Sequence, residues 1–302
     1  MKSYSNEQLF LLVVEMGSFK AVAEHIGGDP SIISRRIASL EQKLTTKLIE
    51  RSTRSSTPTH AGQIYYQGLR HIIDEQNALE QYVSAHTETP IGRLRVAAPH
   101  DFGIRFVMPV LEAMTLDYPQ LEVELVLGSD FADLKEQGID VAIRIGLLPD
   151  SSLMCRKIGD VSRVLVAAPS YVQEKGLPTT FAELKNHHFI LYRNSINAKN
   201  LQLMKNGQVF SQPISGTFTV NSVEAIHQLL LSGRGMHLGP RWAFADDLGA
   251  GNLIEILPDY EFPSSPLNAL YVSRNYLPAK SKVFIERLKT QYQDNNEQFK
   301  GR

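Results

Sequence analysis

The sequence has one cysteine, no long apolar run and almost no net charge. The single Cys155 excludes an intramolecular disulfide framework and a zinc site built from several cysteines. The longest purely apolar runs, such as residues 9–14, are far too short to span a bilayer. No basic segment followed by an apolar stretch and a small-residue cleavage site begins the chain, so we expect a cytoplasmic location. The formal net charge of −1 favours neither nucleic acid nor membrane as a partner. Only a local cluster of charge could indicate such a partner.

The length of 302 residues suits about two domains. Cys155 lies in the stretch LMCRKI and is interpreted as a small core residue, with a redox-sensing role as the alternative. We expect no cofactor and no metal site.

Residues 29–44, DPSIISRRIASLEQKL, predict a helix with two different faces. Asp29 is a suitable N-cap and Pro30 suits the first helical position. The residues that recur at helical spacing and form a buried stripe are Ile33, Ile37, Leu40 and Leu44. The residues that point away from it are Ser31, Arg35, Ala38 and Gln42, with Ser34 flanking the stripe and Arg36 and Lys43 at its edges. Such a small, polar and basic face suits the major groove of DNA, although an ordinary amphipathic surface helix has the same pattern.

The neighbouring segments favour the DNA-binding interpretation. Ser5 and Gln8 form a capping box before a helix that ends at Gly17, and Ser18 caps a second helix over residues 19–26. Three short helices with a glycine turn between the second and third are typical of a helix-turn-helix. Residues 45–60 read as two short extended stretches around a polar turn, which predicts a β-wing.

These residues resemble the winged helix-turn-helix of LysR-type transcriptional regulators. The family pattern falls on GSF at residues 17–19, on Ala21–Ala23, on Ser31–Arg35, on the Leu40-Glu41 pair, on residues 48–51 and on residues 59–62. Two departures are Asp29-Pro30, where the family often has Ser-Gln, and Ile49, where it often has Phe. The missing Gln removes one possible base or phosphate contact, so we expect a different half-site preference. The resemblance implies DNA contacts by Ser31, Ser34, Arg35 and Arg36 on the third helix, joined by Ala38 and Gln42 on its outer face, and by Arg51 and Arg54 on the wing.

A heptad seam follows over residues 59–86. Apolar or amide side chains recur at 4, 3, 4, 3, 4 spacing at Tyr65, Leu69, Ile72, Gln76, Leu79 and Val83. The narrow stripe predicts a dimerisation helix rather than packing against the chain's own body, and the family also uses this linker helix for dimerisation. A dimer would read a roughly palindromic site on double-stranded DNA.

Residues 87–92, TETPIG, form a polar hinge, after which strand and helix patterns alternate. This alternation predicts α/β architecture with a largely parallel sheet. The segments APHDFG and DVAIRIG, at residues 98–103 and 140–146, resemble the effector-binding domain of the same regulators. The resemblance implies a type 2 periplasmic-binding-protein-like domain. The expected fold is α+β overall, with a winged helix-turn-helix at 1–58, a linker helix at 59–88 and an effector domain at 89–302. The effector domain comprises subdomain I at 91–161 plus 266–302 and subdomain II at 162–265.

Ligands of open α/β sheets bind outside the carboxyl ends of strands. The candidate effector-binding residues at such ends are Pro99, His100, Asp101, Phe102, Ser129, Arg144, Gly146, Tyr192 and Arg193. Related regulators often have Ser or Thr where this chain has Asp101, so a carboxylate there would favour a neutral or cationic ligand, or none. A helix cap is the other interpretation of Asp101. His100 is either a pH sensor or structural, and Arg144 either pairs with an acidic effector or forms an ion pair with a neighbour such as Asp140.

No catalytic pattern is evident. His187-His188 lacks a spaced third ligand, residues 232–235 form an incomplete glycine loop, and neither G-x-S-x-G nor a Walker pattern occurs. Ser162, Asp160 and His100 do not assemble into a triad from sequence alone. We therefore expect a transcriptional regulator and not an enzyme. The chain should form a homodimer, and the family resemblance implies a dimer of dimers. The expected partners are a small-molecule effector and, if the protein activates transcription, RNA polymerase. The alternative is an α/β binding or enzymatic domain whose N-terminal helices make protein contacts.

Overall fold

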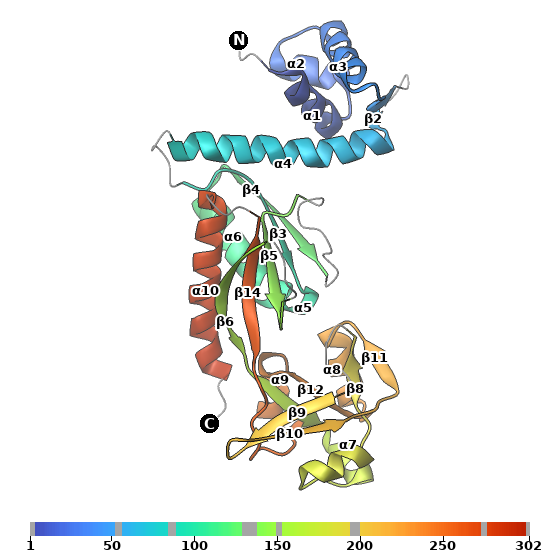
Figure 1. The fold of residues 1–302 in the computed structure, drawn as a ribbon, viewed down its shortest axis with the longest axis vertical. Helices are drawn as coiled ribbons and strands as arrows, with labels where there is room; N and C mark the ends of the chain where they lie inside the picture. Colours follow the sequence, from blue (N-terminus) through green and yellow to red (C-terminus); the bar gives the residue numbers. More distant parts are fainter. Residues whose placement is uncertain are drawn as a thin grey trace. The chain divides into compact units, whose positions relative to one another are not determined.

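The computed structural model describes residues 4–51, 56–83, 89–128, 138–148, 153–193, 200–272 and 277–299 (Figure 1). The chain divides into two compact units, Met1–Glu88 with Asp133–Ile139, and Thr89–Ala132 with Asp140–Arg302. Within the described residues, no helix is both long and apolar enough to cross a membrane.

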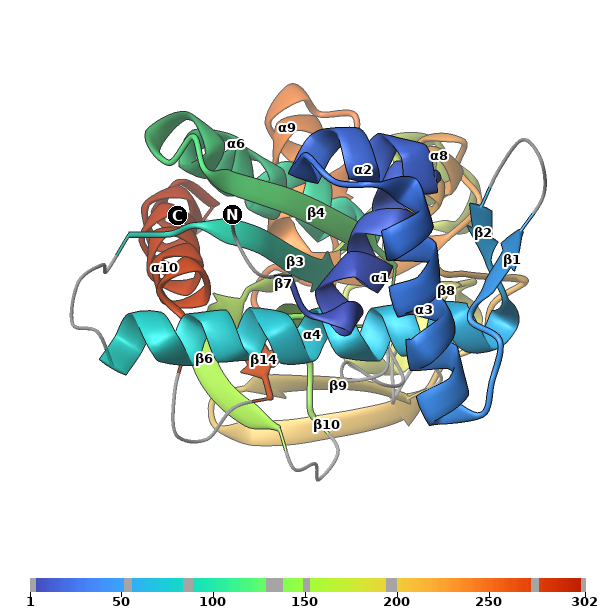
Figure 2. The same cartoon turned by 90° about the horizontal axis from the view of Figure 1, so that it is seen from above.

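The first unit is a winged helix-turn-helix followed by a long helix. Its elements are α1 (Asn6–Met16), α2 (Phe19–Ile26), α3 (Pro30–Leu44), β1 (Ile49–Arg51), β2 (Ser56–Pro58) and α4 (His60–Val83). The predicted caps are present: Ser5 and Gln8 form the capping box of α1, Ser18 caps α2, and the Asp29 carboxylate accepts the amide of Ser31 at 2.7 Å. Gly27 ends α2 at φ +68°, a left-handed conformation that permits the tight turn into α3. Figure 2 shows the two-stranded wing beside α3.

The core of the first unit is built from all of its helices. Three members of the predicted α3 stripe, Ile33, Ile37 and Leu40, are at most 2% exposed, and the fourth, Leu44, is half-buried against the same core. Leu69 of α4 is buried in the same core, and the ring of Tyr65 lies 5.5 Å from that of Phe10 in α1. The prediction that Leu69 belongs to a dimer seam is therefore wrong, because Leu69 is buried in the core of its own chain. Tyr65 is half-buried against α1, and its place in a seam stays a prediction.

A five-stranded sheet organises the first subdomain of the second unit. Its strands are β3 (Gly92–Ala98), β4 (Leu121–Leu127), β5 (Val141–Ile145), β6 (Met154–Val161) and β14 (Ser265–Tyr271), in the order β4-β3-β5-β14-β6. β3 is parallel to β4 and β5, whereas β14 is antiparallel to β5 and β6. The expected largely parallel sheet is thus mixed, because β14 re-enters from the second subdomain in the opposite direction.

Helices cover this sheet and the second subdomain adds smaller sheets. The first subdomain has α5 (His100–Phe102), a π-helical turn (Gly103–Val107), α6 (Met108–Asp117) and α10 (Ala279–Phe299), of which α6 and α10 lie side by side (Figure 1). The second subdomain has β7 (Arg163–Ala167), α7 (Pro169–Lys175), a 3₁₀ helix (Phe181–Asn186), β8 (Ile190–Tyr192), β9 (Asn200–Lys205), β10 (Gln208–Pro213), β11 (Phe218–Val220), α8 (Val223–Leu231), β12 (Met236–Pro240), α9 (Arg241–Ala250) and β13 (Ile254–Glu255).

One side chain of the second subdomain is part of the first subdomain's core. Trp242 of α9 is 6% exposed and lies edge-on to Phe106, with ring centroids 5.3 Å apart. Phe102 and Tyr292 complete this aromatic cluster, and burial raises the pKa of the Tyr292 hydroxyl to about 12. The two subdomains therefore share a hydrophobic contact.

Cys155 does not lie in the core. It is exposed on β6, where the side chains alternate between the two faces of an edge strand, and the interpretation of Cys155 as a small core residue is wrong.

The junction between the wing and α4 leaves no room at Gly62. A Cβ atom at Gly62 would overlap the carbonyl oxygen of Leu48, whereas one at Gly68 on the same helix would meet nothing within 4 Å. We expect Gly62→Ala to destabilise the first unit by about 1–3 kcal/mol. Gly68→Ala, the matched control, should stabilise it by roughly 0.5–1 kcal/mol because alanine is the better helix former. Calorimetric melting of both variants measures this, and a Gly62→Ala protein as stable as wild type would contradict the close packing.

Candidate DNA-binding surface and effector site

The outer face of α3 presents short polar side chains around one arginine. Ser31, Arg35, Ala38 and Gln42 are exposed, and Ser34 is half-buried. The Nε of Arg35 donates to the carbonyl of Ser31 at 3.5 Å, which lays the side chain along the helix toward its N-terminus. Because its neighbours are short, this face can approach a base-pair edge closely, and the Arg35 guanidinium can bridge guanine or phosphate acceptors.

Ile32 also lies on the exposed side of α3, a feature that was not anticipated from the sequence. Its side chain is 51% exposed although the helix has a complete buried stripe without it. The signal was present in the sequence, since Ile32 precedes the stripe residue Ile33 and therefore lies about 100° away from it. An exposed aliphatic group on a groove-facing helix suits contact with the methyl group of thymine.

Arg36 is used inside the domain. Its Nε donates to the side-chain oxygen of Asn6 at 2.7 Å, and its Nη2 donates to the carbonyl of Tyr4 at 2.6 Å. These bonds hold the guanidinium against the start of α1. We therefore remove Arg36 from the predicted base-reading residues and assign it the role of positioning α3 on α1.

A buried carboxylate joins α3 to the wing. Glu41 is 4% exposed, and its Oε1 accepts the amides of Leu48 at 2.9 Å and Ile49 at 3.1 Å. Lys47 forms an ion pair with its Oε2 at 3.1 Å. Burial alone would raise the pKa of this carboxyl, but the two amides and the ammonium outweigh burial and lower it. Glu41 thus fixes the wing relative to α3.

The wing contacts fall partly outside the described residues. Arg54 lies outside them, and the structure describes the backbone of Arg51 at the end of β1 but not its side chain. β2 is held to the helices by the Ser56 amide, which donates to the carbonyl of Gly17 at 3.1 Å.

α4 also carries large aliphatic side chains that are exposed among the described residues. Ile64 and Ile72 are 62% and 60% exposed, and Gln76 is exposed too. Leu79 and Val83 lie on the same helix, but their side chains are outside the described set. Of the six predicted seam residues, Ile72 and Gln76 are therefore exposed, Tyr65 is half-buried and Leu69 is buried.

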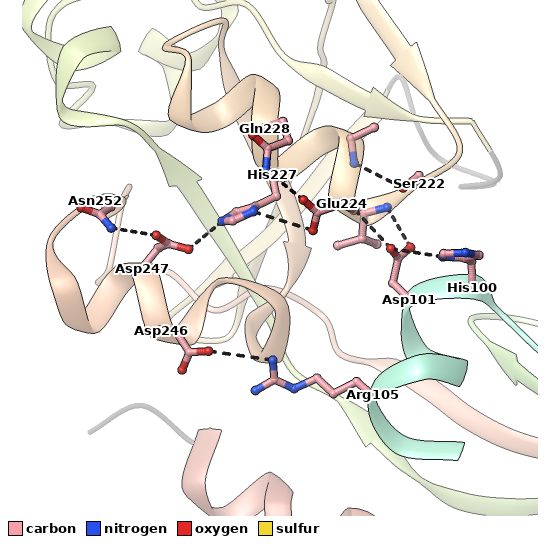
Figure 3. Close-up of polar contacts among 12 residues, drawn as sticks. His100, Asp101, Arg105, Ser222, Glu224, His227, Gln228, Asp246, Asp247 and Asn252 are labelled. Carbon is pink, nitrogen blue, oxygen red and sulfur yellow. Dashed lines mark hydrogen bonds and ion pairs between the residues drawn. The ribbon is translucent and has the colours of Figure 1, made fainter. Parts of the chain in front are cut away.

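In the effector-binding unit, Asp101 contacts the second subdomain. Its Oδ2 accepts the amide of Val223 at 2.9 Å and its Oδ1 the amide of Glu224 at 3.3 Å (Figure 3). Both amides belong to the first turn of α8. Asp101 is thus a helix cap, as one interpretation of the sequence had it, but it caps a helix of the other subdomain and not its own. His100 lies beside it, with Nδ1 3.7 Å from Oδ1.

The other candidate effector residues have different surroundings. Phe102 is 1% exposed in the aromatic cluster, so its assignment to the effector site is wrong. Pro99 and Tyr192 are half-buried at the ends of β3 and β8, and Arg193 follows Tyr192 with its amide bonded to Val220. Gly146 follows β5 at φ +106° and its amide donates to Pro266.

Asp140, one predicted partner of Arg144, is engaged elsewhere. Its carboxylate accepts the amide of Arg95 at 2.7 Å and forms an ion pair with the buried Lys280 at 3.1 Å. Arg144 itself is half-buried and has a partner of its own. Ser129 lies outside the described residues.

A polar network missed by sequence reasoning links α8 to α9. His227 of α8 hydrogen-bonds through Nε2 to Asp247 of α9 at 2.6 Å, and Asn252 donates to the other oxygen of that carboxylate at 2.9 Å (Figure 3). Asn252 and then His227 lower the pKa of Asp247. The network holds the two helices of the second subdomain together.

Comparison with known proteins identifies the class. Residues 6–63 match the family model for the bacterial regulatory helix-turn-helix protein, lysR family, and residues 87–293 match that for the LysR substrate binding domain. The chain belongs to the LysR family of transcriptional regulators, with a helix-turn-helix domain that binds DNA and a domain that binds a small-molecule effector.

Individual relatives match over nearly the whole chain. The HTH-type transcriptional activator AaeR of Escherichia coli is 34% identical over 95% of this chain and 93% of its own length. The structure of CrgA, a LysR-type regulator from Neisseria meningitidis, is 30% identical with a TM-score of 0.59, covering 96% of this chain and 99% of that one. The Vibrio cholerae virulence activator AphB is 28% identical with a TM-score of 0.58, covering 94% and 97%.

The Glu41 carboxylate gives the first unit a pH dependence of known sign. Because its pKa is lowered on folding, its contribution to stability is present above the ordinary value of 4.5 and is lost as the pH falls through the lowered, folded-state pKa. We expect Glu41→Gln to cost about 2–3 kcal/mol at pH 7 and to weaken the acid dependence of the first unit.

Calorimetry between pH 7 and pH 3 measures both effects, and Glu50→Gln on the exposed side of β1 is the control. Fluorescence of Trp242, the one tryptophan of the chain, follows the second unit separately. A Glu41→Gln protein that melts like wild type at pH 7 would contradict the role of this carboxylate.

Proposed function

We propose that the chain binds a roughly palindromic operator as a dimer. The residues of α3 that read bases are Ser31, Ile32, Ser34, Arg35, Ala38 and Gln42. Arg51 and Arg54 of the wing contact the DNA backbone or the minor groove. The observation that carries this proposal is the outer face of α3, where an exposed arginine stands among short side chains while Arg36 and Glu41 lock the helix in place. Phosphate contacts would set the register and the α3 side chains would supply sequence preference.

Dimerisation is assigned to the exposed face of α4. Ile64 and Ile72 are large aliphatic side chains that leave a monomer with an uncovered apolar surface, and helix pairing would bury it. Two copies paired in this way would present two α3 helices to one duplex. The division of labour that follows is residues 1–58 for DNA binding, 59–88 for dimerisation, and 89–302 for the effector, with 91–161 plus 266–302 as subdomain I and 162–265 as subdomain II.

Assembly beyond the dimer is assigned to the second unit. Ile104, Met108 and Leu116, on the π-helical turn and α6, are 47%, 46% and 77% exposed. Burial of these side chains between effector units would give the dimer of dimers. The effector would then bias an equilibrium between arrangements of these units and change half-site spacing or DNA bend. We assign the chain a regulatory and not a catalytic role, in the cytoplasm, where the DNA lies. If it is an activator, as the name of AaeR describes that relative, RNA polymerase is a further partner.

Two adjacent arginines separate base reading from folding. Arg35→Ala should weaken binding to the selected operator by about 1–3 kcal/mol, roughly 5- to 150-fold, and relax base preference while leaving the melting temperature unchanged. Arg36→Ala should instead lower the stability of the first unit, because the Asn6 and Tyr4 acceptors lose their donor. Fluorescence anisotropy with matched and scrambled duplexes measures the affinities. An Arg35→Ala protein with wild-type operator affinity would refute the assignment.

A charge on the open face of α4 should separate the copies. Ile72→Glu is expected to convert the dimer to monomer in sedimentation experiments and to remove most operator affinity, because burying a carboxylate in an apolar seam is costly. Gln63→Glu, at another exposed site about 180° around α4 from Ile72, is the control. If Ile72→Glu sediments as wild type, the dimer forms elsewhere.

A further inference from the structure

The first turn of α8 has its free amides satisfied from two different subdomains. Ser222, the residue before the helix, accepts the amide of Ala225 through its hydroxyl at 3.2 Å. The amides of Val223 and Glu224 instead donate to the carboxylate of Asp101 in the first subdomain (Figure 3). A carboxylate at a helix N-terminus is favoured by the helix dipole as well as by the hydrogen bonds. The first subdomain therefore supplies the negative charge that α8 attracts.

The segment that carries Asp101, which consists of α5 and the π-helical turn after it, contacts the second subdomain at a second place, on α9. Phe102 and Phe106 pack on Trp242, and the Arg105 guanidinium lies 5.9 Å from the Trp242 ring and 4.0 Å from the carboxylate of Asp246. Trp242 is buried in the core of the first subdomain, so breaking this contact would expose several aromatic rings to water.

The two contacts differ in how easily they can be broken. The Trp242 contact is apolar and enclosed, whereas the Asp101 contact consists of two hydrogen bonds made by a side chain that is still 16% exposed. Water or a competing group can therefore reach the Asp101 carboxylate. A π-helical turn over Gly103–Val107 begins two residues after Asp101, and such turns are frequent at functional sites.

We propose that Asp101 is a latch between the two subdomains, with Trp242 as the pivot. The latch holds the first turn of α8 on the first subdomain. Releasing it lets this end of α8 swing away from Asp101 about the buried Trp242, while the His227–Asp247 bond keeps α8 on α9. An anionic group of an effector reaches the α8 amides only by displacing the Asp101 carboxylate. This end of the site therefore favours effectors that bind through groups other than an anion. The selectivity rests on the proposed effector function of this unit; the latch itself does not.

Hydrogen exchange of the full-length protein tests the latch directly. Asp101→Asn keeps the shape of the side chain and removes its charge. It should accelerate exchange of the Val223 and Glu224 amides roughly ten-fold or more, since charge-assisted bonds are about twice as strong as neutral ones. Exchange in α9 around Trp242 should not change. Glu224→Gln is the control. It also removes a carboxylate from this end of α8, but that carboxylate accepts a hydrogen bond from Gln228 of the same helix and not from another subdomain.

A distance measurement tests whether the bond also holds the subdomains together. The exposed Cys155 on β6 provides one spin-label site, and Leu231→Cys at the end of α8 provides the other. In doubly labelled chains diluted with unlabelled protein, the distance distribution should broaden with Asp101→Asn and stay narrow with Glu224→Gln. Asp101→Ser is the second variant should Asp101→Asn not fold.

The outcomes separate the alternatives. Unchanged exchange at Val223 and Glu224 would overturn the bond, and faster exchange with an unchanged distance distribution would overturn the latch and leave a helix cap. Loosening of α9 together with α8 would overturn the pivot. Operator binding is a separate measurement on the same proteins, so a failure of the proposed DNA-binding function would leave these results standing.

Discussion

The DNA-binding unit depends on one buried carboxylate. Glu41 projects from the recognition helix into the junction with the wing, where it accepts the amides that open β1 and pairs with Lys47. A charge with 4% exposure is tolerable only because these partners compensate its lost hydration. The carbonyl of Leu48 in turn accepts the amide of Thr59, whose hydroxyl caps α4. A single hydrogen-bonded path thus runs from the DNA-reading helix through the wing to the helix assigned to dimerisation.

The effector unit depends on a different kind of constraint, in which one helical segment serves two subdomains. Asp101 and Arg105 reach α8 and α9 of the second subdomain, while Phe102 and Phe106 pack in the core of the first. Trp242 crosses in the opposite direction. The aromatic packing on Trp242 fixes α9 of the second subdomain, and the hydrogen bonds of Asp101 hold α8.

Local signals carried the predictions that hold. Caps at Ser5, Ser18 and Asp29 and the stripe of α3 fix the first three helices to the residue, because capping and periodicity are properties of neighbouring positions. Predictions failed where distant segments decide. Neither the partner of Arg36 at Asn6 nor the cover of Leu69 by α1 is visible in local spacing, and the mixed sheet follows from the return of β14 after the second subdomain. Asp101 was recognised as a capping residue, but the helix that it caps begins more than a hundred residues later.

Base reading by α3 is tested most directly by selecting bound sequences from random duplexes with the full-length protein and then measuring affinity against salt concentration. We expect a dyad-symmetric motif whose half-sites lie about one helical turn apart, and a steep fall in affinity as the salt concentration rises. Weak binding without sequence preference, both alone and after addition of small metabolites extracted from cells, would contradict this assignment. In that case the exposed face of α3 would serve protein contacts instead of base reading.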